Sequence, residues 1–189
     1  MTEELLEPYF RKIRICKIKG HIPAGGILCD VGCGFNATFL RDISDYISEG
    51  YGFDKKIEDM RINNIHVKNA DIEARIPLED RYVDCVTMLA VFEHLSHPKR
   101  VLSECVRILK PNGILVLTTP APMSKPLLEF LSFKVGIVSP AEIADHKHYY
   151  SKKELFDLLQ GAGLTDIKCN SFEFGLNNMA IALSEEINE

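Results

Sequence analysis

The chain has 189 residues, of which 46% are hydrophobic and 26% are charged, the composition of one soluble globular domain. This composition excludes a disordered tail, a collagen-like repeat and a small disulfide scaffold. With a formal net charge of −5, the chain lacks the excess of basic residues that is typical of nucleic-acid-binding proteins, so no nucleic-acid partner is expected.

Apolar residues at helical spacing predict a helix over residues 3–19, within an N-terminal segment 1–24. The acidic first residues lack the apolar core of a signal peptide, and no apolar run approaches the ~20 residues of a membrane span. We therefore expect a cytoplasmic protein with reduced cysteines, because no Cys-x-x-Cys pair occurs. Four cysteines lie in apolar runs and are expected to be buried: Cys16, Cys29, Cys85 and Cys105.

From residue 27 onward, short apolar runs alternate with helical patterns, which predicts a parallel sheet with helices on both faces. The expected strands are 27–31, 50–53, 64–68, 83–88 and 114–119. The expected helices are 37–48 and 98–109, with a short helix or loop at 57–62. A turn is expected at Lys110-Pro111-Asn112-Gly113.

The C-terminal part follows a different pattern. Ser151 and Glu154 form a capping box that opens a further helix. The strand-like runs 165–173 and 178–183 follow it. Because the loop between them is too short for a parallel crossover, they must be antiparallel.

A glycine turn follows the first strand, in the run Cys29-Asp30-Val31-Gly32-Cys33-Gly34. Glycine allows a sharp turn and a close approach of a ligand to the backbone, and open α/β sheets bind nucleotides at this edge. The spacing Gly32-x-Gly34-x-x-Ala37 also fits a dinucleotide fingerprint, so the glycines alone do not identify the cofactor.

Carboxylates follow the next two predicted strands. Asp54 lies 20 residues beyond Gly34, where a carboxylate accepts hydrogen bonds from ribose hydroxyls. Asp71 and Ile72 follow the third strand. An Asp can accept a hydrogen bond from the amine of adenine while the apolar neighbour covers the ring.

An acid and an imidazole, Glu93 and His94, follow the fourth strand at the same edge. His94 is therefore a candidate general base. The spacing Glu93-His94-x-x-His97 differs from the zinc-protease pattern, and Pro98 follows at once, so no metal site is expected.

In this order the motifs resemble the class I S-adenosylmethionine-dependent methyltransferases, and most of all their small type 11 and type 12 branch. The run Phe92-Glu93-His94-Leu95 and the run Leu109-Lys110-Pro111-Asn112-Gly113 carry the resemblance together with the glycine turn, Asp54 and Asp71. The resemblance covers residues 26–120 most strongly. It departs from the family at Asn36, where many members have a third glycine.

The resemblance implies a Rossmann-like α/β fold, a seven-stranded sheet of order 3-2-1-4-5-7-6 with the seventh strand antiparallel. It implies S-adenosylmethionine as cofactor and S-adenosylhomocysteine as product. His94 would lie near the methyl donor. The implied cofactor-binding residues are Asp30, Gly32, Gly34, Asp54, Lys55, Asp71, Ile72 and Leu89.

An insertion at 121–148 interrupts the domain, which is otherwise expected to be single over 1–189. Similar enzymes form an acceptor lid here, and the stretch looks like methyltransferases of sugar-polymer biosynthesis. His146 and His148 lie two residues apart, and His146 is a candidate acceptor-binding or base residue.

The sequence thus predicts a methyltransferase acting on a small-molecule or glycan acceptor, with a lipid-linked acceptor as one option, in a monomer or homodimer. Two alternatives stay open. One is an NAD(P)-binding Rossmann oxidoreductase, and the other is a catalytically silent module that keeps the cofactor pocket.

Overall fold

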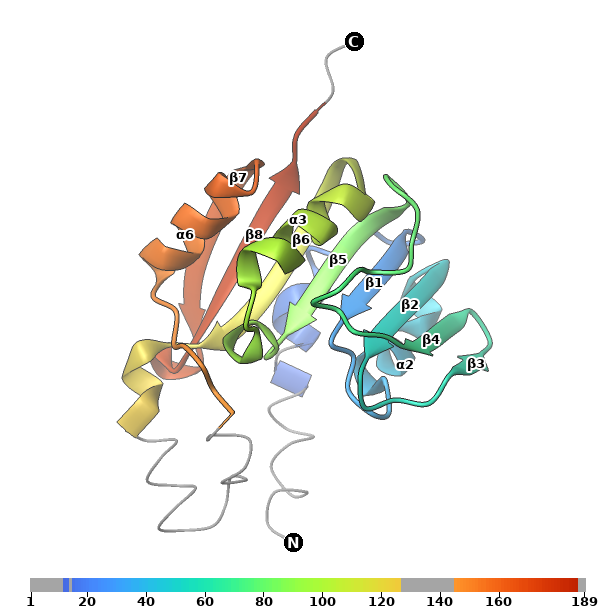
Figure 1. Ribbon diagram of the computed structural model, residues 1–189, viewed down its shortest axis with the longest axis horizontal. Helices are drawn as coiled ribbons and strands as arrows, with labels where there is room; N and C mark the ends of the chain where they lie inside the picture. The colour runs from blue at the N-terminus through green and yellow to red at the C-terminus, as the bar shows by residue number, and fades with distance from the viewer. Residues whose placement is uncertain (1–11, 14, 127–144, 187–189) are drawn as a thin grey trace, which may run out of the picture.

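The computed structural model describes residues 12–13, 15–126 and 145–186. An eight-stranded sheet has the order β3-β4-β2-β1-β5-β6-β8-β7 (Figure 1). Its strands are β1 (Ile27–Val31), β2 (Glu49–Asp54), β3 (Met60–Ile62), β4 (Ile65–Asn69), β5 (Val83–Leu89), β6 (Leu109–Pro120), β7 (Leu164–Phe172) and β8 (Asn177–Ser184). The α-helices are α2 (Thr38–Asp42), α3 (Pro98–Ile108) and α6 (Lys152–Gly161), and the 3₁₀ helices are η1 (Ser44–Tyr46), η2 (Phe92–His94), η3 (Pro122–Ser124) and η5 (Glu173–Gly175).

Five neighbouring strands, β4, β2, β1, β5 and β6, are parallel. Strand β8 runs antiparallel to both β6 and β7. This confirms the Rossmann-like α/β fold and the predicted order of seven strands, with the seventh strand antiparallel.

The eighth strand is β3, which pairs antiparallel with β4 at the sheet edge. The prediction of a short helix or loop over 57–62 was wrong at 60–62. Asn63 has a φ of 52°, so the two asparagines between β3 and β4 close a hairpin that the short apolar runs do not reveal. The Asn64 side chain supports the turn by donating to the carbonyl of Ser44 over 2.9 Å.

The helix predicted over 37–48 is instead the short helix α2 followed by η1. Ala37 before α2 has a φ of 45°, and Ile43 after it leaves the helical region. The single turn of α2 has backbone bonds from Arg41 N to Ala37 O and from Ile43 N to Phe39 O, and burial of Phe39 and Leu40 adds to its stability, because so short a helix is not stable by itself.

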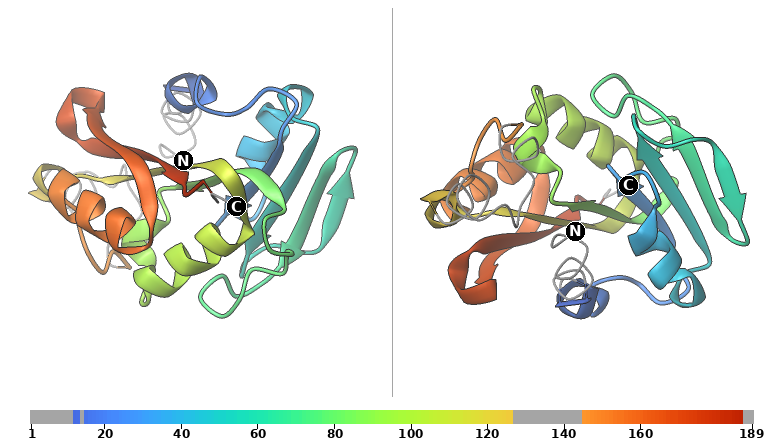
Figure 2. Two further views of the ribbon diagram at one scale, coloured as in Figure 1. Left: turned by 90° about the horizontal axis from the view of Figure 1, so that it is seen from above. Right: turned by 90° about the horizontal axis from the view of Figure 1, so that it is seen from below.

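Helices cover both faces of the sheet, and Figure 2 shows α3 and α6 on one face with α2 and the N-terminal helical residues on the other. Alternate residues of the central strands enter two different cores. Cys29 and Val86 pack with α3 and α6, whereas Leu28 and Cys85 pack with α2. Cysteine burial is confirmed for Cys29, Cys85 and Cys105, but Cys16 is exposed, contrary to prediction.

The predicted turn at residues 110–113 is present as a bulge inside β6. Pairing with β5 jumps from Val83↔Leu109 to Cys85↔Ile114. Of the N-terminal helix predicted over 3–19, residues 12–13 and 15–19 are helical and the rest lies outside the described residues, as do residues 127–144 of the insertion. Within the described ranges, no helix is both long enough and apolar enough to cross a bilayer.

The capping box at the start of α6 is confirmed. Ser151 Oγ accepts from Glu154 N, and the Glu154 carboxylate accepts from Ser151 N over 2.8 Å. The Ser151 hydroxyl also donates to the Glu154 carboxylate over 2.6 Å, and this bond, together with the bond from Ser151 N, lowers the pKa of Glu154 to about 2. The cap matters for the site because α6 begins directly after the segment 145–150.

Replacing Ser151 with Ala should lower the free energy of unfolding by about 1 kcal/mol, because the first turn of α6 loses its cap. Urea unfolding measures the change. Ser103→Ala is the matched control, since Ser103 is an exposed helix serine that bonds only to Lys99 O, and it should change stability by less than about 0.5 kcal/mol. Equal effects of the two substitutions would contradict the capping role.

Candidate functional site

The carboxyl ends of β1, β2, β4 and β5 meet at one edge of the sheet, and the predicted cofactor-binding residues lie at these ends or in the loops that follow them (Figure 1). Parallel strands bring their following loops together, so motifs separated by many residues become neighbours. The structure therefore gathers the predicted cofactor-binding positions at one edge.

The glycine turn after β1 is tied to the end of β2. Gly32 N donates to Phe53 O over 2.8 Å, and Gly34 N donates to Asp54 Oδ2 over 3.0 Å. Both glycines have positive φ angles, 79° and 69°. A Cβ on Gly32 would lie 2.5 Å from Val91 Cγ2, whereas a Cβ on Gly34 would meet no atom within 4 Å. The turn is thus packed on one side and open on the other.

The Asp54 carboxylate accepts two backbone bonds, from Gly34 N and from Lys56 N over 2.8 Å. Each carboxylate oxygen keeps a further lone pair for another donor. Asp54 therefore anchors the glycine turn and still offers acceptors at the strand end, which matches the donor set of a ribose.

Asp30 is buried at 3% exposure, and its Oδ1 accepts a bond from Thr87 Oγ1 over 2.6 Å. Burial raises the pKa of Asp30 to about 7, and the charge of Asp54 raises it further, while the bond from Thr87 opposes the rise. The carboxyl of Asp30 therefore keeps its proton to a higher pH than an exposed aspartate does. Sequence reasoning missed Thr87, which is 57 residues away and becomes adjacent only through pairing of β1 with β5.

The two residues predicted to hold adenine differ in burial. Asp71 is exposed, and its Oδ1 lies 3.0 Å from Lys55 Nζ and accepts from Glu73 N. The bond from Lys55 lowers the pKa of Asp71. Ile72 is buried, and Leu89 is half-buried at the end of β5. This edge of the sheet thus offers two features side by side, namely a carboxylate that accepts hydrogen bonds and apolar side chains.

Glu93, His94 and His146 form a compact group beyond the end of β5. One potential ligand atom from each residue lies within 4.8 Å of the other two. Glu93 is buried at 1% exposure, and the rings of His94 and His146 are 4.7 Å apart in an edge-on arrangement. The structure therefore brings together the two predicted catalytic histidines, which are far apart in sequence.

Each histidine of the group is oriented by a second side chain. His94 Nδ1 lies 3.1 Å from Asp145 Oδ2, and His146 Nδ1 lies 3.0 Å from the Tyr149 hydroxyl. Burial, together with the charge of His94, lowers the pKa of His146 to about 4. His146 is therefore neutral at physiological pH. Sequence reasoning missed Asp145 and Tyr149, and neither belongs to a local pattern that could have revealed it.

The segment 145–150 is fastened to η2 through its backbone. Lys147 N and His148 N both donate to Glu93 O, over 2.9 and 3.4 Å. His148 then turns away from His146, lying 3.0 Å from Glu154 and edge-on to the ring of Tyr150. The two neighbouring histidines of this segment thus have different surroundings.

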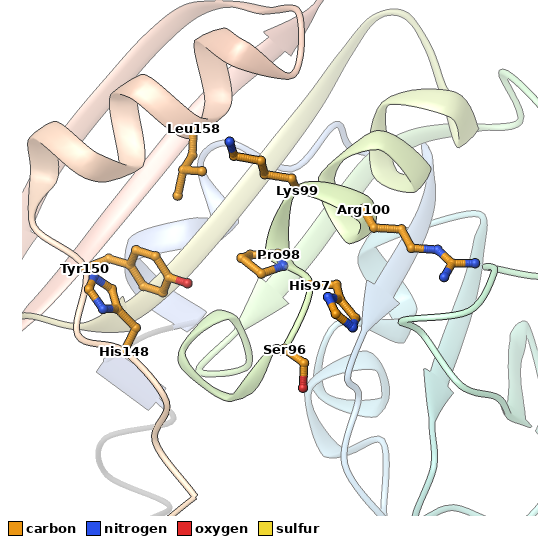
Figure 3. Close-up of a pocket in the computed structure, with 8 residues that line it drawn as sticks. All are labelled: Ser96, His97, Pro98, Lys99, Arg100, His148, Tyr150 and Leu158. Carbon is orange, nitrogen blue, oxygen red and sulfur yellow. The ribbon is translucent and has the colours of Figure 1, made fainter.

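An open pocket of about 670 Å³ lies beside this segment (Figure 3). Figure 3 shows that its walls come from the start of α3, from residues 148–150 and from α6. None of its lining residues is a predicted cofactor-binding residue, so this hollow is separate from the glycine turn. The lining residues are Ser96, His97, Pro98, Lys99, Arg100, His148, Tyr150 and Leu158.

A family profile described as a methyltransferase domain matches residues 6–168. The chain belongs to this methyltransferase family. The match is consistent with the site, in which this edge of the sheet brings carboxylates and glycines together. It confirms the resemblance to methyltransferases that was drawn from the sequence.

Named relatives support the same family. A probable S-adenosylmethionine-dependent methyltransferase of Mycolicibacterium smegmatis is 28% identical over 148 residues, covering 76% of this chain and 53% of the relative. A ubiquinone biosynthesis O-methyltransferase of Idiomarina loihiensis is 24% identical, covering 86% of this chain and 72% of the relative. This methyltransferase-family chain thus spans about half the length of the first of these relatives.

A solved structure from Thermotoga maritima, described as an S-adenosylmethionine-dependent methyltransferase and possible histamine N-methyltransferase, has the same fold. Its TM-score is 0.68 at 19% identity, and the match covers 97% of this chain and 98% of that one. The names of the Mycolicibacterium smegmatis relative and the Thermotoga maritima structure include S-adenosylmethionine, in agreement with the predicted cofactor. The individual roles of the site residues stay predictions.

Because the pKa of Asp30 is higher in the folded protein (about 7) than its ordinary value of 3.8, ionisation of Asp30 opposes folding. This cost is absent below about pH 4, grows as pH rises to 7, and reaches at most about 4 kcal/mol. Asp30→Asn cannot ionise. Its free energy of unfolding relative to wild type should therefore rise between pH 4 and pH 8, as measured by urea unfolding.

The control for this pH series is Asp45→Asn, at an exposed residue of η1. Its difference from wild type should be flat over the same pH range. A flat difference for Asp30→Asn as well would contradict the raised pKa.

Gly32→Ala and Gly34→Ala form a matched pair, because both place an alanine at positive φ but only the first clashes with Val91. Gly34→Ala should cost about 1 kcal/mol of unfolding free energy from backbone strain alone. Gly32→Ala should cost at least about 2 kcal/mol more. Thermal and urea unfolding test this order, and equal losses would contradict the packing of Val91 on the turn.

Proposed function

We propose that the protein transfers a methyl group from S-adenosylmethionine to a small-molecule or glycan-type acceptor. The observation that carries the proposal is the bond between Gly34 N and the Asp54 carboxylate, which sets an open glycine turn beside free acceptor lone pairs. Donors and acceptors of this kind suit the ribose and the amino-acid part of the cofactor.

The cofactor-facing residues have chemically distinct tasks in this proposal. Asp54 accepts hydrogen bonds from the two ribose hydroxyls. Asp71 accepts from the adenine amine after exchanging part of its contact with Lys55, and Ile72 covers the ring. In this proposal the methionine part of the cofactor lies along the glycine turn near the buried carboxyl of Asp30, whose charge would be stabilised by the ammonium and sulfonium groups of the cofactor.

When bound, the cofactor supplies a methyl group already activated on a sulfonium, so alignment of the attacking atom provides much of the rate. As the new bond to the acceptor forms, the carbon–sulfur bond breaks and sulfur keeps the electron pair. The protein must therefore orient the acceptor, exclude water and receive one proton when the acceptor is a hydroxyl.

The histidine pair is suited to this last task. His94 is oriented by Asp145 through Nδ1, which leaves Nε2 as the proton acceptor, the arrangement of a general base. His146 has a pKa near 4 and is a weak base, so we assign it to acceptor binding. The relatives named O-methyltransferases favour oxygen as the methylated atom.

The test of this function is calorimetric titration of the full chain with S-adenosylhomocysteine. Asp54→Ala should lower the affinity by roughly tenfold or more, because charged acceptors for the ribose are lost. Asp45→Ala, an exposed carboxylate of η1 removed in the same way, should leave the affinity unchanged.

NAD and NADP serve as competing ligands in the same titration, and neither should bind. Binding of a nicotinamide cofactor in place of S-adenosylhomocysteine would favour the oxidoreductase. Binding of S-adenosylhomocysteine without methylation of any hydroxyl acceptor in a broad panel would favour a silent binding module.

A further inference from the structure

We propose that Glu93, His94 and His146 form a binding site for a divalent transition-metal ion of the zinc type. One potential ligand atom from each of the three residues lies within 4.8 Å of the other two. The sequence predicted no metal here, because it suggested only the pair of His94 and His97. The fold pairs His94 with His146 instead.

The donor set itself selects the class of metal. Two imidazoles and one carboxylate are the three protein ligands of many catalytic zinc sites, which keep a fourth position open for water or substrate. Mg²⁺ and Ca²⁺ prefer oxygen ligands only, so nitrogen donors disfavour them. Ligand atoms around a tetrahedral zinc ion are about 3.4 Å apart, so the widest separation in the group, up to 4.8 Å, needs to shorten by about 1.4 Å at most.

The partners of the two histidines match those of metal-bound imidazoles. A metal-binding histidine usually has its second ring nitrogen held by a carboxylate or another polar group. Here Asp145 lies against Nδ1 of His94, and the Tyr149 hydroxyl lies against Nδ1 of His146. With Nδ1 engaged in these contacts, each ring would offer Nε2 to a metal.

The protein backbone also holds the group together. The carbonyl of Glu93 accepts from Lys147 N, which fixes the segment carrying His146 against the short helix carrying His94. The Glu93 side chain is buried, so its carboxylate would be poorly hydrated. The electrostatic attraction between this carboxylate and a bound cation would therefore be strong. A site preorganised in this way loses little conformational entropy on binding.

The site deepens the proposed function, on which this part of the inference rests. The group lies beyond the end of β5, beside the loops of the predicted cofactor site. An open coordination position there would bind an acceptor hydroxyl and lower its pKa, so that its proton passes to water. In the metal-loaded protein this replaces direct proton acceptance by His94.

The test is titration of the full, chelator-treated chain with Zn²⁺ and with Co²⁺, without a polyhistidine tag and without cofactor. The background carries Cys16→Ser, because Cys16 is an exposed cysteine and a thiolate is itself a metal ligand that would add to the titration signal. We expect one ion per chain with a Kd of about 1 μM or tighter, and visible Co²⁺ absorption bands of a tetrahedral N/O site. Mg²⁺ in excess should not compete.

Glu93→Gln, His94→Ala and His146→Ala should each weaken binding at least tenfold and remove the Co²⁺ bands. Asp145→Asn should weaken binding by roughly 10–100-fold through the orientation of His94. His97→Ala is the matched control, an exposed histidine three residues from His94, and it should change nothing. Thermal unfolding checks each variant, and His146→Gln replaces His146→Ala if that variant does not fold.

Absence of one-to-one binding, or equal affinity in His146→Ala and wild type, would overturn the metal site. Equal loss in His97→Ala would also overturn it, since it would point to scattered surface histidines. Because the titration contains no cofactor, failure here leaves the binding of S-adenosylhomocysteine, and with it the proposed function, to be judged separately.

Discussion

The packing of Val91 against Gly32 is the contact on which the whole site depends. It joins the turn after β1 to the turn after β5, and a single Cβ on Gly32 would lie 2.5 Å from the valine. Because β1 and β5 are adjacent and parallel, both turns leave the sheet at the same edge. The tight contact then sets η2, and with it Glu93 and His94, directly beside the glycine turn.

The three aspartate carboxylates at this edge each have a hydrogen-bond or ion-pair partner, and one of them is buried. Asp54 is anchored by two backbone donors, Asp71 by Lys55, and the buried Asp30 by Thr87. Burial without a cation raises the pKa of Asp30. A cationic cofactor beside these carboxylates would offset their desolvation, which links the architecture of the edge to the chemistry of a sulfonium.

Most of the fold was predictable because its signals are local. Buried β-strands and amphipathic helices have different periods of apolar residues, so the alternation around residues 27–119 indicated the parallel sheet directly. The capping box at Ser151 is equally local and was correct. The errors fall where local pattern and tertiary packing compete. The strand β3 is too short to show alternation, the helix predicted over 37–48 is divided by Ile43, and Cys16 lies on an exposed face of its helix.

The sequence by itself determined where most of the strands lie along the chain, the glycine turn, and the spacing that sets Asp54 and Asp71 at the ends of consecutive parallel strands, because residues near one another in the chain control these features. The order of the strands in the sheet was implied only by the resemblance to the methyltransferases. Only the tertiary structure decided which distant side chains meet. Thr87 reaches Asp30 across 57 residues, and Asp145 reaches His94 across 51. Such contacts arise from strand pairing and from the backbone bonds of Glu93 to the segment 145–150, and no local periodicity encodes them.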